Sequence, residues 1–152
     1  RGDASTVAAV AGDIKPRRIA FDFDRTIAST KSGAAPIVGK HAADVDLISL
    51  MWKYSCVVVT RNQNKEAIRL FLEDQGAPPG TEICIVGKKE SKAAHILGFR
   101  QTGEGDTNLK NLTPVEDTRP ILFVDDSVQE LADPLVAQES IIYRVLFVRS
   151  LA

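Results

Sequence analysis

The sequence predicts a three-layer, Rossmann-like α/β domain with a mainly parallel five-stranded sheet. Strand and helix signals alternate along the chain, which is typical of parallel strands joined by helical crossovers. The strand segments are continuous apolar runs, as expected where helices cover both faces of a sheet. At 152 residues the chain has the length of one domain. We expect residues 1–15 to form a mobile segment and residues 16–152 to form a single domain.

Residues 18–53 are predicted to form one strand, one loop and one helix. A strand is predicted at residues 18–24, and the Gly, Ala, Ser and Pro content of residues 28–42 predicts a loop. Residues 43–53 have apolar side chains at helical spacing and predict a helix. We expect Met51 and Trp52 of this helix to pack in the core.

The same alternation continues to the end of the chain. Residues 100–119 have little periodicity and predict a long polar loop. Cys56 and Cys84 lie in apolar runs and are expected to be reduced. Pro134 is expected to stop a short helix. The other predicted strands are 56–60, 82–86, 120–125 and 141–148, and the other predicted helices include 67–72 and 92–97.

The net charge of −1 gives no overall field that favours nucleic acid or an anionic membrane. A local basic patch remains compatible with this balance, so a nucleic-acid partner is not excluded. No apolar run approaches the roughly 20 residues of a membrane span, and we see no secretory signal. We therefore expect a cytoplasmic protein without membrane contact, and the sequence leaves its oligomeric state open.

Acidic side chains gather where the predicted strands end. The first strand ends in Asp22 and Asp24, the second in Thr60, and the fourth in Asp125 and Asp126. The carboxyl ends of parallel strands share one edge of a sheet, where ligands bind. Two carboxylates about 4 Å apart repel by roughly 4 kcal/mol at an effective dielectric of about 20, so they need protons or a cation. Ligands that are all oxygen favour a hard cation, and Mg²⁺ is the best match.

These segments resemble the four motifs of the haloacid dehalogenase (HAD) superfamily. "FDFDRTI" resembles the first motif and "CVVVT" the second, while "ESKAAHIL" resembles the third and "ILFVDDS" the fourth. The resemblance extends over about residues 18–148. It implies a HAD-like fold and a Mg²⁺-dependent phosphatase that hydrolyses phosphomonoesters through an aspartyl-phosphate intermediate.

The resemblance also implies roles for individual residues. Asp22 would be the nucleophile, and Asp24 the general acid/base whose main-chain carbonyl binds the metal. Thr60 would donate a hydrogen bond to the phosphoryl group. Lys88, Lys89 and Lys92 are all candidates for the lysine of the third motif, with Lys92 favoured and Lys89 second.

The acidic pair and four neighbouring residues complete the expected site. The family pattern favours Asp126 as the direct metal ligand and Asp125 as a partner of the lysine, although the two roles can be exchanged. The expected metal ligands are therefore Asp22, Asp24, Asp125 and Asp126. The expected substrate-binding residues are Arg25, Thr26, Arg61 and Asn62. Arg25 stands where many family members have Gly, and both arginines either clamp the substrate phosphate or project into solvent.

Family members often carry a cap domain over the site, but residues 28–42 and 87–91 are too short to form one. An open site favours, by analogy, a large substrate such as a phosphoprotein or a nucleic-acid end. A phosphotransferase or atypical kinase is the first alternative, although no GxxxxGK[ST] motif is present. A non-catalytic module that binds a phosphorylated ligand is the second, and the presence of both Asp22 and Asp24 argues against it.

Overall fold

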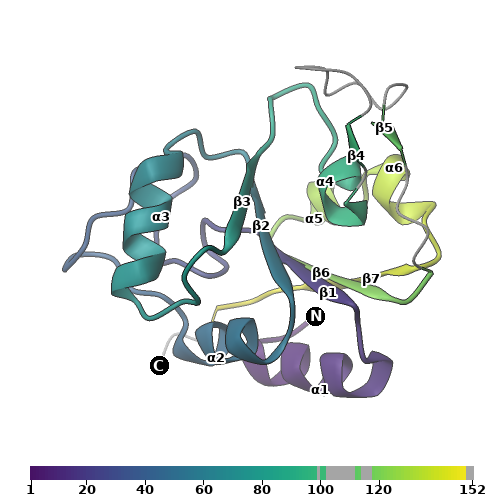
Figure 1. Cartoon of the computed structure of the whole chain (residues 1–152), viewed down its shortest axis with the longest axis horizontal. Coiled ribbons are helices and arrows are strands. Elements are labelled where there is room, and N and C mark those ends of the chain that lie inside the picture. Colours follow the sequence, from purple (N-terminus) through teal and green to yellow (C-terminus); the bar gives the residue numbers. More distant parts are fainter. Residues whose placement is uncertain (99, 102–111, 114–117, 150–152) are drawn as a thin grey trace.

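The structure is a computed structural model that describes residues 1–98, 100–101, 112–113 and 118–149. Its central sheet has five strands, all parallel, in the order β3-β2-β1-β6-β7 (Figure 1). This arrangement confirms the predicted three-layer α/β fold. The strands are β1 (Arg18–Phe21), β2 (Cys56–Thr60), β3 (Glu82–Ile85), β6 (Ile121–Asp125) and β7 (Ile142–Leu146).

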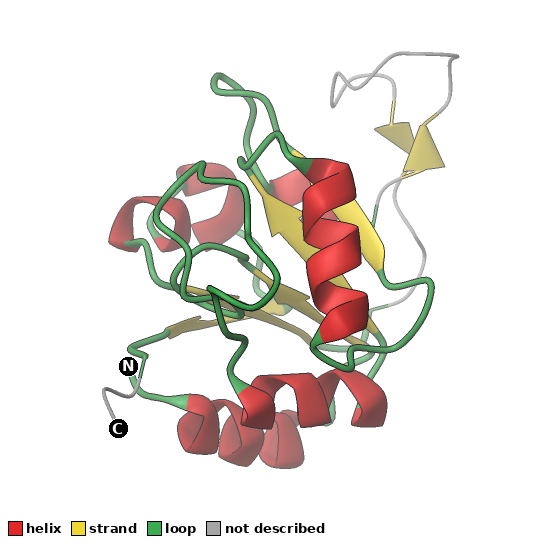
Figure 2. Cartoon of the chain, turned by 90° about the vertical axis from the view of Figure 1, so that its left-hand side faces the viewer, coloured by secondary structure: helices red, strands yellow, loops and turns green. Residues whose placement is uncertain are grey.

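Helices cover both faces of this sheet (Figure 2). The buried residues form two hydrophobic clusters, one on each side of the strands. One cluster takes its helical residues from α1 (Ala4–Ile14), α2 (Val45–Lys53) and α3 (Lys65–Asp74). The other takes them from α4 (Ala93–Leu97), α5 (Val128–Leu131) and α6 (Pro134–Ala137).

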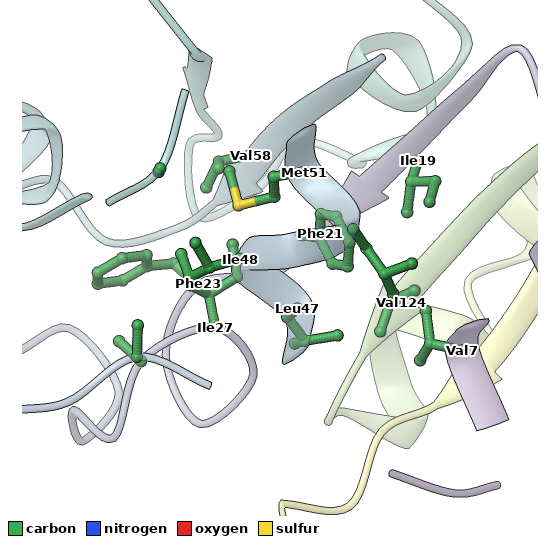
Figure 3. Packing of buried hydrophobic residues seen from close by; sticks show 14 of the residues in the cluster. Val7, Ile19, Phe21, Phe23, Ile27, Leu47, Ile48, Met51, Val58 and Val124 are labelled. Atoms are coloured by element: carbon green, nitrogen blue, oxygen red, sulfur yellow. The ribbon is translucent and has the colours of Figure 1, made fainter. Parts of the chain in front are cut away.

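The alternation of side chains along β1 determines which way its acidic end points. Ile19 and Phe21 are fully buried in the cluster of α1, α2 and α3 (Figure 3). Phe23 follows the strand and joins the same cluster, where its ring packs edge-on against Phe71 with centroids 5.8 Å apart. Because successive side chains of an extended chain alternate, Asp22 points to the opposite side from both phenylalanines.

The segment of residues 1–15 does not match the expected mobile tail, because it contains the helix α1. Asp3 caps this helix by accepting a hydrogen bond from the Ser5 amide at 3.0 Å. Val7 and Ala11, four residues apart, are fully buried in the core cluster that also holds residues of α2. This spacing gives α1 a narrow apolar stripe that packs against the domain.

Only one of the two large residues expected in the core of α2 is there. Met51 is 4% exposed, whereas Trp52 is 61% exposed and donates from its indole nitrogen to the Gly76 carbonyl at 2.7 Å. The buried face of α2 is formed by Leu47, Ile48, Leu50 and Met51. Trp52 lies about 100° further around the helix than Met51, which places it beyond the edge of this face. The expectation for Trp52 was wrong.

The second half of the chain differs from expectation at two points. The helix α5 ends at Leu131, before Pro134, as expected. Pro134 is the first residue of a further helix, α6, which Asp133 caps by accepting from the Leu135 amide. Within the expected loop at 100–119, β4 (Arg100–Gln101) and β5 (Leu112–Thr113) form an antiparallel pair. Residues 102–111 and 114–117 of that loop lie outside the described residues.

Two further observations concern the state of the cysteines and the character of the helices. Cys56 and Cys84 are free thiols with intermediate burial. In the described part of the chain, no helix has both the length and the apolar character that a membrane crossing needs.

Candidate active site

A pocket of about 440 Å³ opens where β1, β2 and β6 end. Asp22 and Asp24 enter it from the end of β1, Thr60 from β2, and Asp125 and Asp126 from β6. The structure therefore brings together the strand-end residues that the sequence placed at one edge. The remaining residues that line the pocket are Ser32, Gly33, Arg61, Asn62, Lys88, Lys92, Ser127, Gln129 and Glu130.

Three of the carboxylates form a cluster that could hold a metal ion. Asp22, Asp125 and Asp126 each offer an oxygen, and these oxygens all lie within 4.8 Å of one another. Asp22 and Asp125 are buried, and Asp126 is partly exposed. The Asp24 carboxylate is not part of this cluster, so the side chains of three of the four predicted metal ligands lie together. The resemblance implied that Asp24 binds the metal through its main-chain carbonyl, and this stays a prediction.

Lys92 inserts its ammonium group among the acidic side chains. Its Nζ lies 2.8 Å from Asp125 Oδ2, 3.1 Å from Asp22 Oδ1 and 3.3 Å from Glu130 Oε2. The side chain is 3% exposed, whereas Lys89 is exposed. Lys88 is exposed and lines the pocket as well, but of the three candidates Lys92 is the one for which ion pairs with the acidic cluster are observed.

The protonation of the cluster is governed by burial and by mutual charge. Burial raises the pKa of Asp22 to about 7, against the lowering effect of Lys92. Burial and then the charge of Asp22 raise the pKa of Asp125 to about 7 as well, again opposed by Lys92. Burial alone would lower the pKa of Lys92, but the surrounding carboxylates outweigh it and raise this pKa. The carboxyl groups thus compete for protons near neutral pH, and a divalent cation would favour their ionised forms.

The Asp24 carboxylate is held apart from the cluster by three donors. Oδ1 accepts from the Thr30 hydroxyl at 2.6 Å, and Oδ2 accepts from the Gly33 amide at 2.9 Å. The side-chain nitrogen of Asn62 (Nδ2) lies 3.1 Å from Oδ1 and 3.2 Å from Oδ2. Asp24 thus lines the same pocket as Asp22 but belongs to a separate hydrogen-bond network.

The two arginines expected at the substrate do not stand free in the pocket. Arg61 lines it, but its guanidinium forms an ion pair with Glu130 at 3.1 Å and donates to the carbonyls of Gly87 and Glu90. Arg25 is exposed and is not among the pocket-lining residues. It adopts a left-handed conformation, with φ at 59°, which glycine adopts with least strain. The solvent-facing alternative matches Arg25. Arg61 lines the pocket with its guanidinium paired to Glu130, and a clamp on the substrate phosphate by Arg61 stays a prediction.

The other polar residues predicted at the site are engaged with its acidic groups or its backbone. Thr26 is fully buried and donates to Asp22 Oδ2 at 3.2 Å. Thr60 lines the pocket, and its hydroxyl accepts a hydrogen bond from the backbone N–H of Asn62 at 3.0 Å. Asn62 uses its side-chain nitrogen on Asp24 and on the Ala34 carbonyl. Thr26 and Asn62 are therefore placed to orient the carboxylates of Asp22 and Asp24, and substrate contact by them stays a prediction.

Glu130 is a charged site residue that the sequence did not predict. Ser127 caps α5 by accepting from the Glu130 amide at 3.3 Å, so the two residues match the S-x-x-E pattern of a helix start. In that pattern the glutamate normally turns back to the cap. Here its carboxylate contacts Arg61 and Lys92 instead. The pattern could have located the helix, but not these partners.

The pocket thus combines a cluster of three carboxylates suited to a hard cation with the buried ammonium of Lys92. It also contains the carboxylate of Asp24, two residues after Asp22. Such a site can bind and neutralise an anionic group next to a nucleophilic oxygen. Comparisons with protein-family models, curated proteins and solved structures found no match to this chain. The functional conclusion therefore rests on the site and on its sequence motifs.

Proposed function

We propose that this protein is a Mg²⁺-dependent phosphatase of the HAD superfamily that hydrolyses phosphomonoesters through an aspartyl-phosphate on Asp22. The observation that supports this most directly is the position of Lys92 between Asp22 and Asp125, at 3.1 and 2.8 Å. A carboxylate nucleophile and a phosphate dianion repel each other, so their reaction needs positively charged groups close to both of them. Lys92 supplies one such charge, and the adjoining cluster of carboxylates could hold a second.

In the first step, an oxygen of Asp22 forms a bond to phosphorus while the bond from phosphorus to the leaving-group oxygen breaks. Protonated Asp24 gives its proton to that oxygen, so the product alcohol leaves neutral. Lys92 stabilises the charge on the transferring group, and Thr60 is placed at the pocket wall to donate a hydrogen bond. Bound Mg²⁺ would supply further charge compensation.

In the second step, water attacks the phosphorus of the intermediate. Asp24 takes a proton from this water, and the bond between phosphorus and Asp22 breaks. Inorganic phosphate leaves, and both aspartates return to their starting states. The division of labour fits the two hydrogen-bond networks, because Asp22 contacts the cation of Lys92 whereas Asp24 contacts neutral donors.

The proposed substrate is large, such as a phosphoprotein or a nucleic-acid end. Residues 28–42 form a loop, and β3 connects to α4 through residues 86–92, so neither segment forms a cap domain. A cytoplasmic location is part of the same proposal.

Hydrolysis of p-nitrophenyl phosphate with Mg²⁺, with and without a chelator, tests the proposed function. We expect turnover by the wild type that the chelator abolishes and excess Mg²⁺ restores. Asp22→Asn, which nearly preserves the shape of the side chain, should be inactive under all conditions. Turnover that survives both the chelator and Asp22→Asn would contradict the proposal, and binding of phosphate without turnover would favour the non-catalytic module.

A further inference from the structure

Residues 30–34, called the strap below, contact Asp24 and line one side of the pocket through Ser32 and Gly33. Ser29, Lys31 and Ser32 are exposed, yet Thr30 between them is fully buried. Its hydroxyl donates to Asp24 Oδ1 at 2.6 Å. The loop therefore turns one hydroxyl inward, towards a single acidic group.

The strap is fixed at its other end as well. The Gly33 amide donates to Asp24 Oδ2 at 2.9 Å, and the Gly33 carbonyl accepts from the Asn64 side chain at 3.2 Å. The Ala34 carbonyl accepts from the Asn62 side chain at 2.8 Å. Asp24 and the segment after β2 thus hold the strap together, and a shift of the strap would move the carboxylate.

The number of donors limits where Asp24 can exchange a proton. A carboxylate offers about four acceptor positions. Thr30, Gly33 and Asn62 each direct a donor at it, and Asn62 is shared between the two oxygens. About one position is left. Because Asp24 lines the pocket, that position is available to a group bound there.

We propose that the strap is a positioning element, with Thr30 as its main contact, that aims the free position of Asp24 at the leaving-group oxygen of the substrate. Ser32 and Gly33 line the pocket on this side, so the strap also forms the wall beside the leaving group. This inference rests on the phosphatase function proposed above. Thr30 acts through Asp24 and does not itself touch the reacting atoms.

The dependence of the rate on the leaving group separates positioning from a general structural role. A good leaving group such as p-nitrophenolate departs with little protonation, whereas an alkoxide needs the proton of Asp24. The ratio kcat/KM reports the steps up to the departure of the leaving group. It is therefore insensitive to the later attack of water, in which Asp24 acts on every substrate alike.

The test measures kcat/KM with Mg²⁺ for p-nitrophenyl phosphate and for an alkyl phosphate. Thr30→Val preserves the size of the side chain and removes its hydroxyl. We expect it to lower kcat/KM at least about 10-fold for the alkyl phosphate and less than about 3-fold for p-nitrophenyl phosphate. Thr30→Ser should restore both values. Ser29→Ala is the matched control, because Ser29 binds the Ala42 amide at the base of the same loop and makes no hydrogen bond to Asp24; it should change neither value.

Asn62→Ala removes a second donor to the same carboxylate and should show the same preference for the good leaving group, which keeps the test informative if Thr30→Val does not fold. If the wild type is active and Asp22→Asn is inactive, but Thr30→Val and Asn62→Ala lower kcat/KM equally for both substrates, the role of the strap is overturned and the proposed function stands. A wild type that hydrolyses neither ester, or an active Asp22→Asn, would overturn the proposed function and this inference with it.

Discussion

Lys92→Met should destabilise the protein strongly, because it leaves buried carboxylates without their cation. The ammonium lies within 3.3 Å of three carboxylate oxygens, on Asp22, Asp125 and Glu130. At about 3 Å and an effective dielectric of about 20, each contact is worth about 5 kcal/mol before the cost of removing the ammonium from water. The Coulomb attraction is largely offset by the cost of removing the ammonium from water. Removal of one partner of a buried ion pair therefore lowers the free energy of unfolding by about 3–5 kcal/mol.

The loss should depend on pH. Without metal, the pKa values of Asp22 and Asp125 are about 7 in the folded protein against an ordinary 3.8. Folding therefore takes up protons between about pH 4 and pH 7, and the free energy of unfolding falls as the pH rises through this window. Lys92 lowers both pKa values, so its loss raises them further and makes this fall steeper. As the pH falls below about 7, Asp22 and Asp125 become neutral in the folded protein, so two of the three carboxyl groups that contact Lys92 lose their charge.

Urea unfolding in the presence of a chelator measures this difference. We expect Lys92→Met to lower the free energy of unfolding by about 3–5 kcal/mol at pH 8 and by clearly less at pH 5. Lys89→Met is the matched control on an exposed lysine of the same segment, and should stay within about 0.5 kcal/mol of the wild type at both pH values. A loss for Lys92→Met that is equal at both pH values, or larger at pH 5, would refute the reasoning.

Three further predictions concern metal and stability. Mg²⁺ at about 100 times its dissociation constant should stabilise the wild type by about 2.7 kcal/mol in thermal unfolding, and Asp126→Asn should reduce this gain; equal gains would contradict the metal site. Arg149→Ala should cost about 1.5–3 kcal/mol in urea unfolding, because the guanidinium donates to the carbonyls of Thr26 and Ile27. Phe23→Ala should cost about 3–5 kcal/mol and the exposed Trp52→Ala clearly less, so a reversed order would contradict the assigned core.

The sheet and the convergence of acidic residues were predictable because both follow from local patterns. Continuous apolar runs located β2 and β6, and the shared edge of a parallel sheet brought Asp22 and Asp125 together. The helix α1 escaped because its segment consists mainly of small residues. Its weak apolar stripe, which includes Val7 and Ala11, becomes informative only against the surface on which it packs.

The partners of individual side chains were not predictable in the same way. Arg61 follows β2 at the pocket, as expected, but its ion pair depends on where the short helix α5 places Glu130. Composition predicted a loop at residues 28–42 without indicating that Thr30 turns inward to Asp24. Arg61 and Glu130 are 69 positions apart, and Thr30 is six positions from Asp24 within an irregular loop. Neither contact follows the spacing of a helix or a strand, so a periodic pattern carries no information about them.

The most direct test of the central claim is to trap the phosphoenzyme and locate its phosphate. Asp24→Asn keeps the nucleophile and removes proton transfer, so with an aryl phosphate it should form the intermediate and hydrolyse it slowly. Rapid acid quench with a ³²P-labelled aryl phosphate, followed by peptide mapping, should find the label on Asp22, and Asp22→Asn should show none. A label on another residue, or one that persists in Asp22→Asn, would contradict the account.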